Sequence, residues 1–363
     1  MSAIRELLER AVELDASDVH IKSGQEPFFR INGHLSESGF ESLSAESVLA
    51  IAHELIPPHL QKSYNADHEA DFSHFEEDVG RFRVNVFLAQ GAPSIAMRYV
   101  RSEIPTFEQL RLPTQLRGLA QVPRGIVIVT GTTGSGKSTT LAAVMGEINR
   151  NLRKRIITVE DPIEYIFDDD QSVISQREVG LDTMSFQNAL RHVMRQDPEV
   201  ILIGEIRDRT SIRTALLAAE TGHLVMTTLH AGTADQAIPR MLDMFPGDEQ
   251  PQIRVGLAAN LHGAICQRLL VDTQGGAIPT VEILYNTPTV RKMIYKNQLD
   301  QIAAAIETGA EDGMQSFNQS IYELIKADLI TEEEGMRHAT NPEALRMNLQ
   351  GIFLDESRRI LSQ

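Results

Sequence analysis

The stretch Gly131-Thr-Thr-Gly-Ser-Gly136-Lys137-Ser138 determines most of what the sequence establishes about this chain. It follows the apolar run at residues 126–129 and precedes a segment with helical apolar spacing, so its context is strand, loop and helix. Glycines let successive backbone N–H groups turn around a phosphate, and the N-terminus of the following helix favours the same anion. The sequence therefore predicts a loop that binds a nucleoside triphosphate.

Each residue of this loop is a candidate contact for the phosphates. Lys137 supplies a mobile positive charge for the β- and γ-phosphates, and Ser138 supplies a hydroxyl for Mg²⁺. The predicted nucleotide-binding residues are Gly131, Thr132, Thr133, Gly134, Ser135, Gly136, Lys137, Ser138 and Thr139.

The overall composition excludes several classes of protein. The chain has 363 residues, enough for two or three domains, and a formal net charge of −16. That charge repels phosphate backbones, and with no Trp and only 6 Tyr the chain lacks interleaved aromatic residues for base stacking, so we expect no nucleic-acid partner. One cysteine, Cys266, excludes an intrachain disulfide framework and a cysteine-rich zinc site. No run of 18 apolar residues and no signal-peptide pattern occur, which predicts a cytoplasmic protein.

Residues 1–105 have the pattern of a small α+β domain. We expect helices at residues 4–12 and 45–56, strands at 19–21, 28–31, 81–87 and 94–100, and a hairpin turn at Asn32-Gly33. The acidic segment at residues 67–78 is expected to be mostly loop.

Prolines 105, 113 and 123 mark a connecting segment, so we place a domain boundary near residue 105. Residues 106–270 then alternate short apolar strands with helices, which predicts a parallel α/β core. The expected strands lie at residues 126–129, 156–159, 200–203 and 224–228, with helices at 184–196 and 211–219. After one more strand at 280–284, residues 271–363 have a mostly helical pattern.

Glu205 is the first candidate catalytic carboxylate. Residues 200–203 followed by Gly204-Glu205 have the form of a Walker B strand, with glycine where many ATPases carry a metal-binding aspartate. At the end of this strand, Glu205 can reach the metal through water or orient the attacking water. The alternative is an ordinary ion pair with Arg207 or Arg209.

Glu160 and Glu164 are two further candidates for the general base. They follow the buried strand at 156–159, and the carboxyl ends of parallel strands face the ligand crevice of such folds. The sequence leaves the choice among Glu160, Glu164 and Glu205 open.

His223 and His230 stand at the two ends of the strand at residues 224–228. An imidazole beside a nucleotide site can donate to the γ-phosphate and act as a sensor of its loss, so both are candidate catalytic residues. The alternative is that each is an ordinary core or surface histidine. No cysteine accompanies them, which argues against a metal site.

Four motifs in series now identify a family. GTTGSGKST, ITVEDPIEY, DPEVILIGEIRD and AAETGHLVMTTLHAG resemble the Walker A, Asp, Walker B and His boxes of the secretion ATPases. Within that superfamily the chain resembles the type IV pilus retraction ATPases (the PilT/PilU class). The segments SDVH at 17–20, ING at 31–33, GRFRVNVF at 80–87 and GMQSF at 313–317 extend the resemblance over nearly the whole chain.

This resemblance implies a PAS-like N-terminal domain, a RecA-like ATPase core and a C-terminal helical region. It implies a homohexameric ATP- and Mg²⁺-dependent motor that retracts pili and supports twitching motility, acting on a platform protein at the cytoplasmic side of the inner membrane. Pilus extension and type II secretion ATPases usually carry an additional N-terminal domain and a four-cysteine zinc element, so retraction is the expected activity.

The resemblance also implies that arginines of the first domain reach the nucleotide and stabilise charge there. Arg81, Arg83 and Arg98 occupy the matching region, and Arg81 and Arg83 alternate onto one face of their strand. The alternative partner of these arginines is the acidic segment at residues 76–78. Arg207 and Arg240 are further candidates.

Two departures keep a second function open. The stretch at residues 289–294 matches only in part the AIRNL-type stretch of retraction ATPases, and His262 stands where related chains often have arginine. Together with Gly204, these departures leave room for an accessory or regulatory nucleotide-gated ring that works with a paralogous retraction ATPase.

Overall fold

The computed structural model describes residues 3–31, 33–100 and 103–352. The chain folds into two compact units. Unit 1 consists of residues 1–104, 161–167 and 177–184, and unit 2 consists of residues 105–160, 168–176 and 185–363. Both units combine helices with a β-sheet, which confirms the predicted α/β class. The division at residues 1–105, 106–270 and 271–363 stays a prediction.

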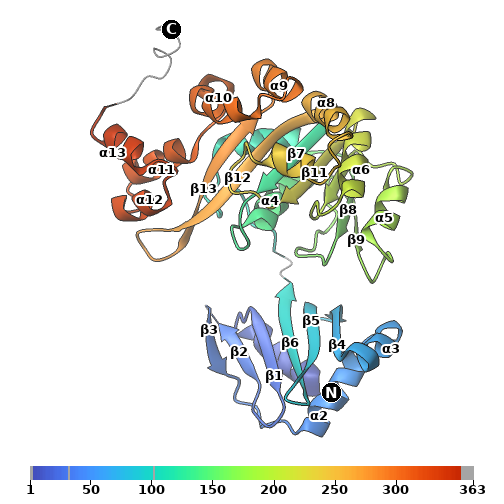
Figure 1. Cartoon of the computed structure of the whole chain (residues 1–363). Coiled ribbons are helices and arrows are strands. Elements are labelled where there is room, and N and C mark those ends of the chain that lie inside the picture. The colour runs from blue at the N-terminus through green and yellow to red at the C-terminus, as the bar shows by residue number, and fades with distance from the viewer. Residues whose placement is uncertain (1–2, 32, 101–102, 353–363) are drawn as a thin grey trace, which may run out of the picture. The chain divides into compact units, whose positions relative to one another are not determined.

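Unit 1 is built on an antiparallel sheet with the strand order β3-β2-β1-β6-β5-β4 (Figure 1). Its elements are α1 (Ala3–Glu13), β1 (Asp18–Lys22), β2 (Phe28–Ile31), β3 (His34–Glu37), α2 (Ala45–Leu55), α3 (Pro58–Asp67), β4 (Glu69–Glu76), β5 (Gly80–Ala89) and β6 (Ala92–Val100). Helix α2 begins because the Ser44 side chain accepts a hydrogen bond from the Ser47 N–H, and it ends before Pro57. Asn32 of the predicted hairpin turn lies outside the described residues.

The expectation that residues 67–78 form a loop is wrong. These residues contain β4, which pairs with β5 along its whole length and forms an edge of the sheet. Ala70 is buried and Phe72 packs against the unit 1 core, while Glu69 and Asp71 are exposed. The acidic composition therefore belongs to the solvent face of an edge strand, where charged side chains oppose unwanted strand pairing.

Unit 2 is built on a sheet that has the strand order β13-β12-β7-β11-β10-β8-β9 in the described part of the chain. Strands β8, β10, β11, β7 and β12 run parallel, and β13 runs antiparallel to β12. The strands are β7 (Gly125–Thr130), β8 (Arg155–Glu160), β9 (Val173–Glu178), β10 (Val200–Ile203), β11 (Leu224–Leu229), β12 (Leu261–Val271) and β13 (Ala277–Tyr285).

The helices of unit 2 connect these strands and continue to the end of the described chain (Figure 1). They are η1 (Thr114–Gln121), α4 (Lys137–Asn151), α5 (Phe186–Val193), α6 (Arg209–Glu220), α7 (Ala237–Leu242), α8 (Gln250–Asn260), α9 (Pro288–Tyr295), η2 (Leu299–Gln301), α10 (Ile302–Thr308), η3 (Ala310–Asp312), α11 (Phe317–Lys326), α12 (Glu332–His338) and α13 (Pro342–Leu349). Within the described ranges, no helix has both the length and the apolar character needed to cross a lipid bilayer.

The central strands of unit 2 agree with the sequence predictions because each is buried on both faces. Every residue of β7, β10 and β11 is buried, which explains their continuous apolar runs. Strand β12 was not predicted, since Gln267 and Arg268 interrupt its apolar pattern. It pairs with β13, and the predicted strand at residues 280–284 is longer than expected.

Candidate active site

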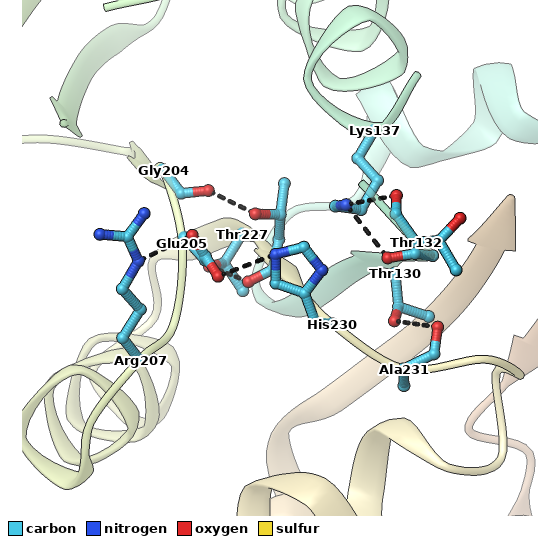
Figure 2. A network of polar contacts seen from close by, with 11 residues as sticks. Thr130, Thr132, Lys137, Gly204, Glu205, Arg207, Thr227, His230 and Ala231 are labelled. Atoms are coloured by element: carbon cyan, nitrogen blue, oxygen red, sulfur yellow. Dashed lines mark hydrogen bonds and ion pairs between the residues drawn. The ribbon is translucent and has the colours of Figure 1, made fainter. Parts of the chain in front are cut away.

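Three neighbouring parallel strands of the unit 2 sheet end on the same side, and the predicted motifs follow their carboxyl ends. We call this row of strand ends the carboxyl edge of the sheet. Strand β7 leads into the phosphate loop, β10 into Gly204-Glu205 and β11 into His230. Ligands of open parallel sheets bind at this edge. Figure 2 shows Lys137, Glu205 and His230 in this region.

The glycines at positions 131 and 136 are required by the geometry of the phosphate loop. Gly131 has a φ of +145°, and a Cβ atom there would lie 2.5 Å from both the Gln267 carbonyl oxygen and the Ser135 Oγ. Gly136 has a φ of +85°, and its Cβ would lie 2.7 Å from Gln267 Nε2. Both the backbone angle and the lack of space therefore exclude a side chain.

The loop ends at α4, whose first turn contains Lys137, Ser138 and Thr139. Lys137 Nζ donates to the carbonyl oxygens of Gly131 and Thr132 at 3.1 and 3.0 Å, so the ammonium group lies directly over the loop (Figure 2). A positive charge and a helix N-terminus therefore lie together at this loop, an arrangement that favours an anion.

Gln267 is a site residue that the sequence reasoning missed. Its side chain is 3% exposed, donates from Nε2 to the Ser135 carbonyl oxygen at 2.8 Å and accepts from Thr140 Oγ1 at 2.6 Å. Gln267 therefore links the phosphate loop to the first turns of α4. Its sequence signal was the pair of polar residues, Gln267 and Arg268, inside a largely apolar stretch.

Glu205 contacts Arg207, one of the two arginines of the alternative interpretation, and also His230, a contact that the sequence did not predict. Its Oε2 accepts from Arg207 Nε at 2.8 Å, and its Oε1 lies 3.2 Å from His230 Nε2 (Figure 2). The Glu205 side chain is 21% exposed, and those of Arg207 and His230 are 61% and 52% exposed. The carboxylate is therefore oriented by two partners while it stays accessible to water.

Gly204, which stands where many ATPases carry an aspartate, lies against Glu160. A Cβ atom on Gly204 would lie 3.3 Å from Glu160 Cα and 3.6 Å from its Cγ. Glu160 is 8% exposed, and its Oε1 accepts from Thr158 Oγ1 at 2.6 Å and from Gln176 Nε2 at 3.2 Å. A buried carboxylate of β8 thus occupies the space beside position 204.

Glu164 lies outside unit 2, and His223 is not brought to this edge. Glu164 is exposed and belongs to unit 1. His223 precedes β11, where the neighbouring Leu224 pairs with Gly125 at the start of β7, and its Nδ1 lies 2.9 Å from the Ala218 carbonyl oxygen. His223 precedes β11 and His230 follows it, so the two histidines lie at opposite ends of the strand. The expectation that both histidines flank one site is therefore corrected.

The three candidate arginines of unit 1 share the sheet face opposite its core. Arg83 is exposed and pairs in register with Arg98, and Arg98 Nε donates to Asp18 at 2.8 Å. Arg81 Nη2 donates to Glu178 Oε2 at 2.7 Å. The acidic partner of Arg81 is therefore Glu178, not the segment at residues 76–78. Arg240, a further candidate, is exposed on α7 of unit 2.

A sequence model of the family described as "Type II/IV secretion system protein" matches residues 1–336. The chain belongs to this family. It is 38% identical over 345 residues to the type IV pilus ATPase PilU of Pseudomonas aeruginosa, covering 95% of this chain and 90% of PilU. It is also 38% identical over 340 residues to the "Type IV pilus retractation ATPase PilT" of the same organism, covering 94% of this chain and 99% of PilT.

Solved structures of family members have the same fold. The pilus retraction motor PilT with bound ADP is 40% identical, with a TM-score of 0.86 over 94% of this chain and 98% of that one. The ATPase DotB of Legionella pneumophila is 25% identical, with a TM-score of 0.79 over 96% of this chain and 95% of that one. The resemblance to pilus retraction ATPases of the secretion ATPase family is therefore confirmed.

Proposed function

We propose that this chain is an ATP-hydrolysing, Mg²⁺-dependent motor that drives retraction of type IV pili. The observation that carries the proposal is the placement of the phosphate loop, Glu205 and His230 at one edge of the sheet in a homologue of PilT. PilT is named as a retraction motor and has been solved with ADP bound. We further propose that unit 1 is PAS-like and that the unit 2 core is RecA-like.

The loop residues fit a nucleoside triphosphate. Gly131 and Gly136 have positive φ values and no space for a side chain, as expected where the backbone wraps closely around phosphates. Lys137 would bind the β- and γ-phosphates, and Ser138 would hold Mg²⁺ with Glu205 reaching the ion through water. When bound, the ion neutralises charge on the phosphate oxygens.

We assign the general base to Glu205. Its carboxylate is partly exposed, whereas the Glu160 carboxylate is buried and accepts hydrogen bonds from Thr158 and Gln176. Glu205 would take the proton of the attacking water, and His230 would hold the second carboxylate oxygen in place and sense the γ-phosphate. Glu160 remains the alternative base.

The assembly and partners complete the proposal. We propose a homohexamer at the cytoplasmic face of the inner membrane, in which Arg81, Arg83 and Arg98 stabilise charge on the nucleotide and the ring acts on a pilus platform protein. ATP and ADP would favour different arrangements of the two units, which gives each cycle a direction. The exposed Arg83 supports part of this role, because it is available for a ligand.

The second candidate is an accessory ring with weak ATPase activity that works with a paralogous retraction ATPase. The equal identity of 38% to PilU and to PilT leaves room for it. Gly204 points the same way, because it replaces the aspartate that many related ATPases use.

The deciding experiment measures Mg²⁺-dependent ATP hydrolysis and particle mass for the wild type and Glu205→Gln. We expect a hexamer whose turnover falls by about 10²-fold or more in Glu205→Gln, with ATP binding kept, because the variant retains shape but not basicity. Glu220→Gln, an exposed residue at the end of α6, is the matched control. A wild-type ring that binds ATP without turnover, and is activated by a paralogue, would favour the accessory function.

A further inference from the structure

The backbone that follows His230 is fixed by side chains from three neighbouring strands. Thr130, Cys266 and Glu282 stand at one register of β7, β12 and β13. Thr130 Oγ1 and Cys266 Sγ donate to the Ala231 carbonyl oxygen at 3.2 and 3.7 Å. Glu282 Oε2 accepts from the Ala234 N–H at 2.6 Å. We call residues 230–236 the His-box loop.

Arg268 connects this loop to the C-terminal helices. Its Nη2 donates to the Gly232 carbonyl oxygen at 3.2 Å, and its Nη1 donates to the His338 carbonyl oxygen at the end of α12 at 2.8 Å. The guanidinium carbon also lies 3.8 Å from the centre of the Phe317 ring, the first residue of α11. One side chain thus contacts the His-box loop and two C-terminal helices.

Glu282 makes a second connection between the same parts. Its side chain is 7% exposed, and burial raises its pKa to about 7, while the backbone N–H of Ala234, the charge of Arg268 and the backbone N–H of Phe317 favour its ionised form. The carboxylate therefore accepts a hydrogen bond from the loop, and its charge is favoured by the Phe317 N–H at the start of α11. Two apolar side chains of similar size could fill the positions of Arg268 and Glu282, so packing alone does not require this charged pair.

We infer that Arg268 and Glu282 are positioning residues that couple the His-box loop, and through it the His230–Glu205 contact, to the first turn of α11. The inference rests on the proposed ATPase function for its catalytic consequence. Each side chain holds backbone atoms of the loop and atoms of the C-terminal helices at the same time. A shift of His230 at the carboxyl edge of the sheet is therefore transmitted to α11. A force applied to α11 is in turn transmitted to His230.

Two variants test this coupling. Glu282→Gln keeps the shape of the side chain. It replaces one of the two acceptor oxygens by an NH₂ group, which cannot accept a hydrogen bond from a backbone N–H. Arg268→Met keeps the apolar stem over Phe317 and removes the donors. Asp272→Asn is the matched control, because Asp272 is a buried carboxylate of the same hairpin that accepts from the Gln274 and Gly276 N–H groups, outside the His-box loop.

Hydrogen exchange of the full-length chain is the readout that needs no turnover. We expect each of the two variants to raise exchange about tenfold or more in both the His-box loop and the first turn of α11. Exchange in α4 should stay unchanged, and the control should leave both segments as in the wild type. Unchanged exchange in either segment would overturn the inference.

Kinetics supply the second readout. We expect kcat to fall about tenfold in both variants while the Kd of a non-hydrolysable ATP analogue stays within twofold. In a double-mutant cycle with His230→Ala, the losses should be non-additive, because Arg268 and Glu282 act through the loop that carries His230. Additive losses, or a weakened Kd with kcat kept, would contradict the inference. A wild type without turnover would contradict the proposed function alone, and the exchange experiment would then decide the coupling.

Discussion

Substitution of Gly204 by aspartate tests whether the Glu160 carboxylate occupies the space that the side chain of a Walker B aspartate would need. A Cβ on residue 204 would lie 3.6 Å from Glu160 Cγ, and Glu160 is only 8% exposed. Two carboxylates about 5 Å apart at an effective dielectric constant of about 20 repel each other by roughly 3 kcal/mol. We therefore expect Gly204→Asp to lower the free energy of unfolding by about 3 kcal/mol beyond the steric cost.

Gly204→Ala measures that steric cost by itself. Its Cβ would lie 3.3 Å from Glu160 Cα and 3.4 Å from the Val159 carbonyl oxygen, so the neighbouring strand must move by a few tenths of an ångström, at a cost of about 1 kcal/mol. The double variant Gly204→Asp with Glu160→Gln removes one of the two charges. It should regain most of the difference between the aspartate and alanine variants.

The assay is urea-induced unfolding of the full chain at pH 8 in EDTA, so that no divalent ion bridges the two carboxylates. The order of stability should be wild type, Gly204→Ala, the double variant and then Gly204→Asp. If Gly204→Asp is as stable as Gly204→Ala, the two carboxylates do not share this space. If the double variant is as unstable as Gly204→Asp, the cost is steric and the electrostatic reasoning is refuted.

Three further predictions concern single residues. Gln267→Ala should weaken nucleotide binding about tenfold and destabilise the chain by about 1–3 kcal/mol, measured by analogue titration and urea unfolding, because buried partners in the phosphate loop lose their hydrogen bonds. Burial lowers the pKa of His262, so unfolding stability should fall as the pH drops below about 6.5, and His262→Phe should lose this dependence in the same unfolding assay. Burial raises the pKa of the Cys266 thiol to about 12, so mass spectrometry should find it unalkylated by iodoacetamide in the native chain and alkylated in urea. Rapid alkylation of the native chain would contradict the last of these.

The expectation that nucleic acid is no partner also stays a prediction. Single-stranded DNA should not stimulate ATP hydrolysis, because the formal net charge of −16 repels phosphate backbones. Stimulation that disappears at high salt would contradict this expectation.

The strands and helices that the sequence predicted correctly are those with strong local patterns. Strands β7, β10 and β11 are buried on both faces and therefore read as continuous apolar runs. The acidic strand β4 and strand β12 were missed because charged or polar residues interrupt their apolar patterns, although β4 pairs with the next strand, β5, and β12 with the next strand, β13, as well as with the distant β7.

By itself, the sequence determined the α/β class and the family and predicted the phosphate loop, because glycines, Lys137 and Ser138 at fixed spacing carry a local backbone requirement. Only the tertiary structure decided which distant residues meet. Parallel strand direction brought His230 to Glu205 and left His223 at the other edge, and the register of β12 placed Gln267 beneath the phosphate loop. Such neighbours depend on strand order and register, which are set by packing over the whole sheet and not by any segment alone.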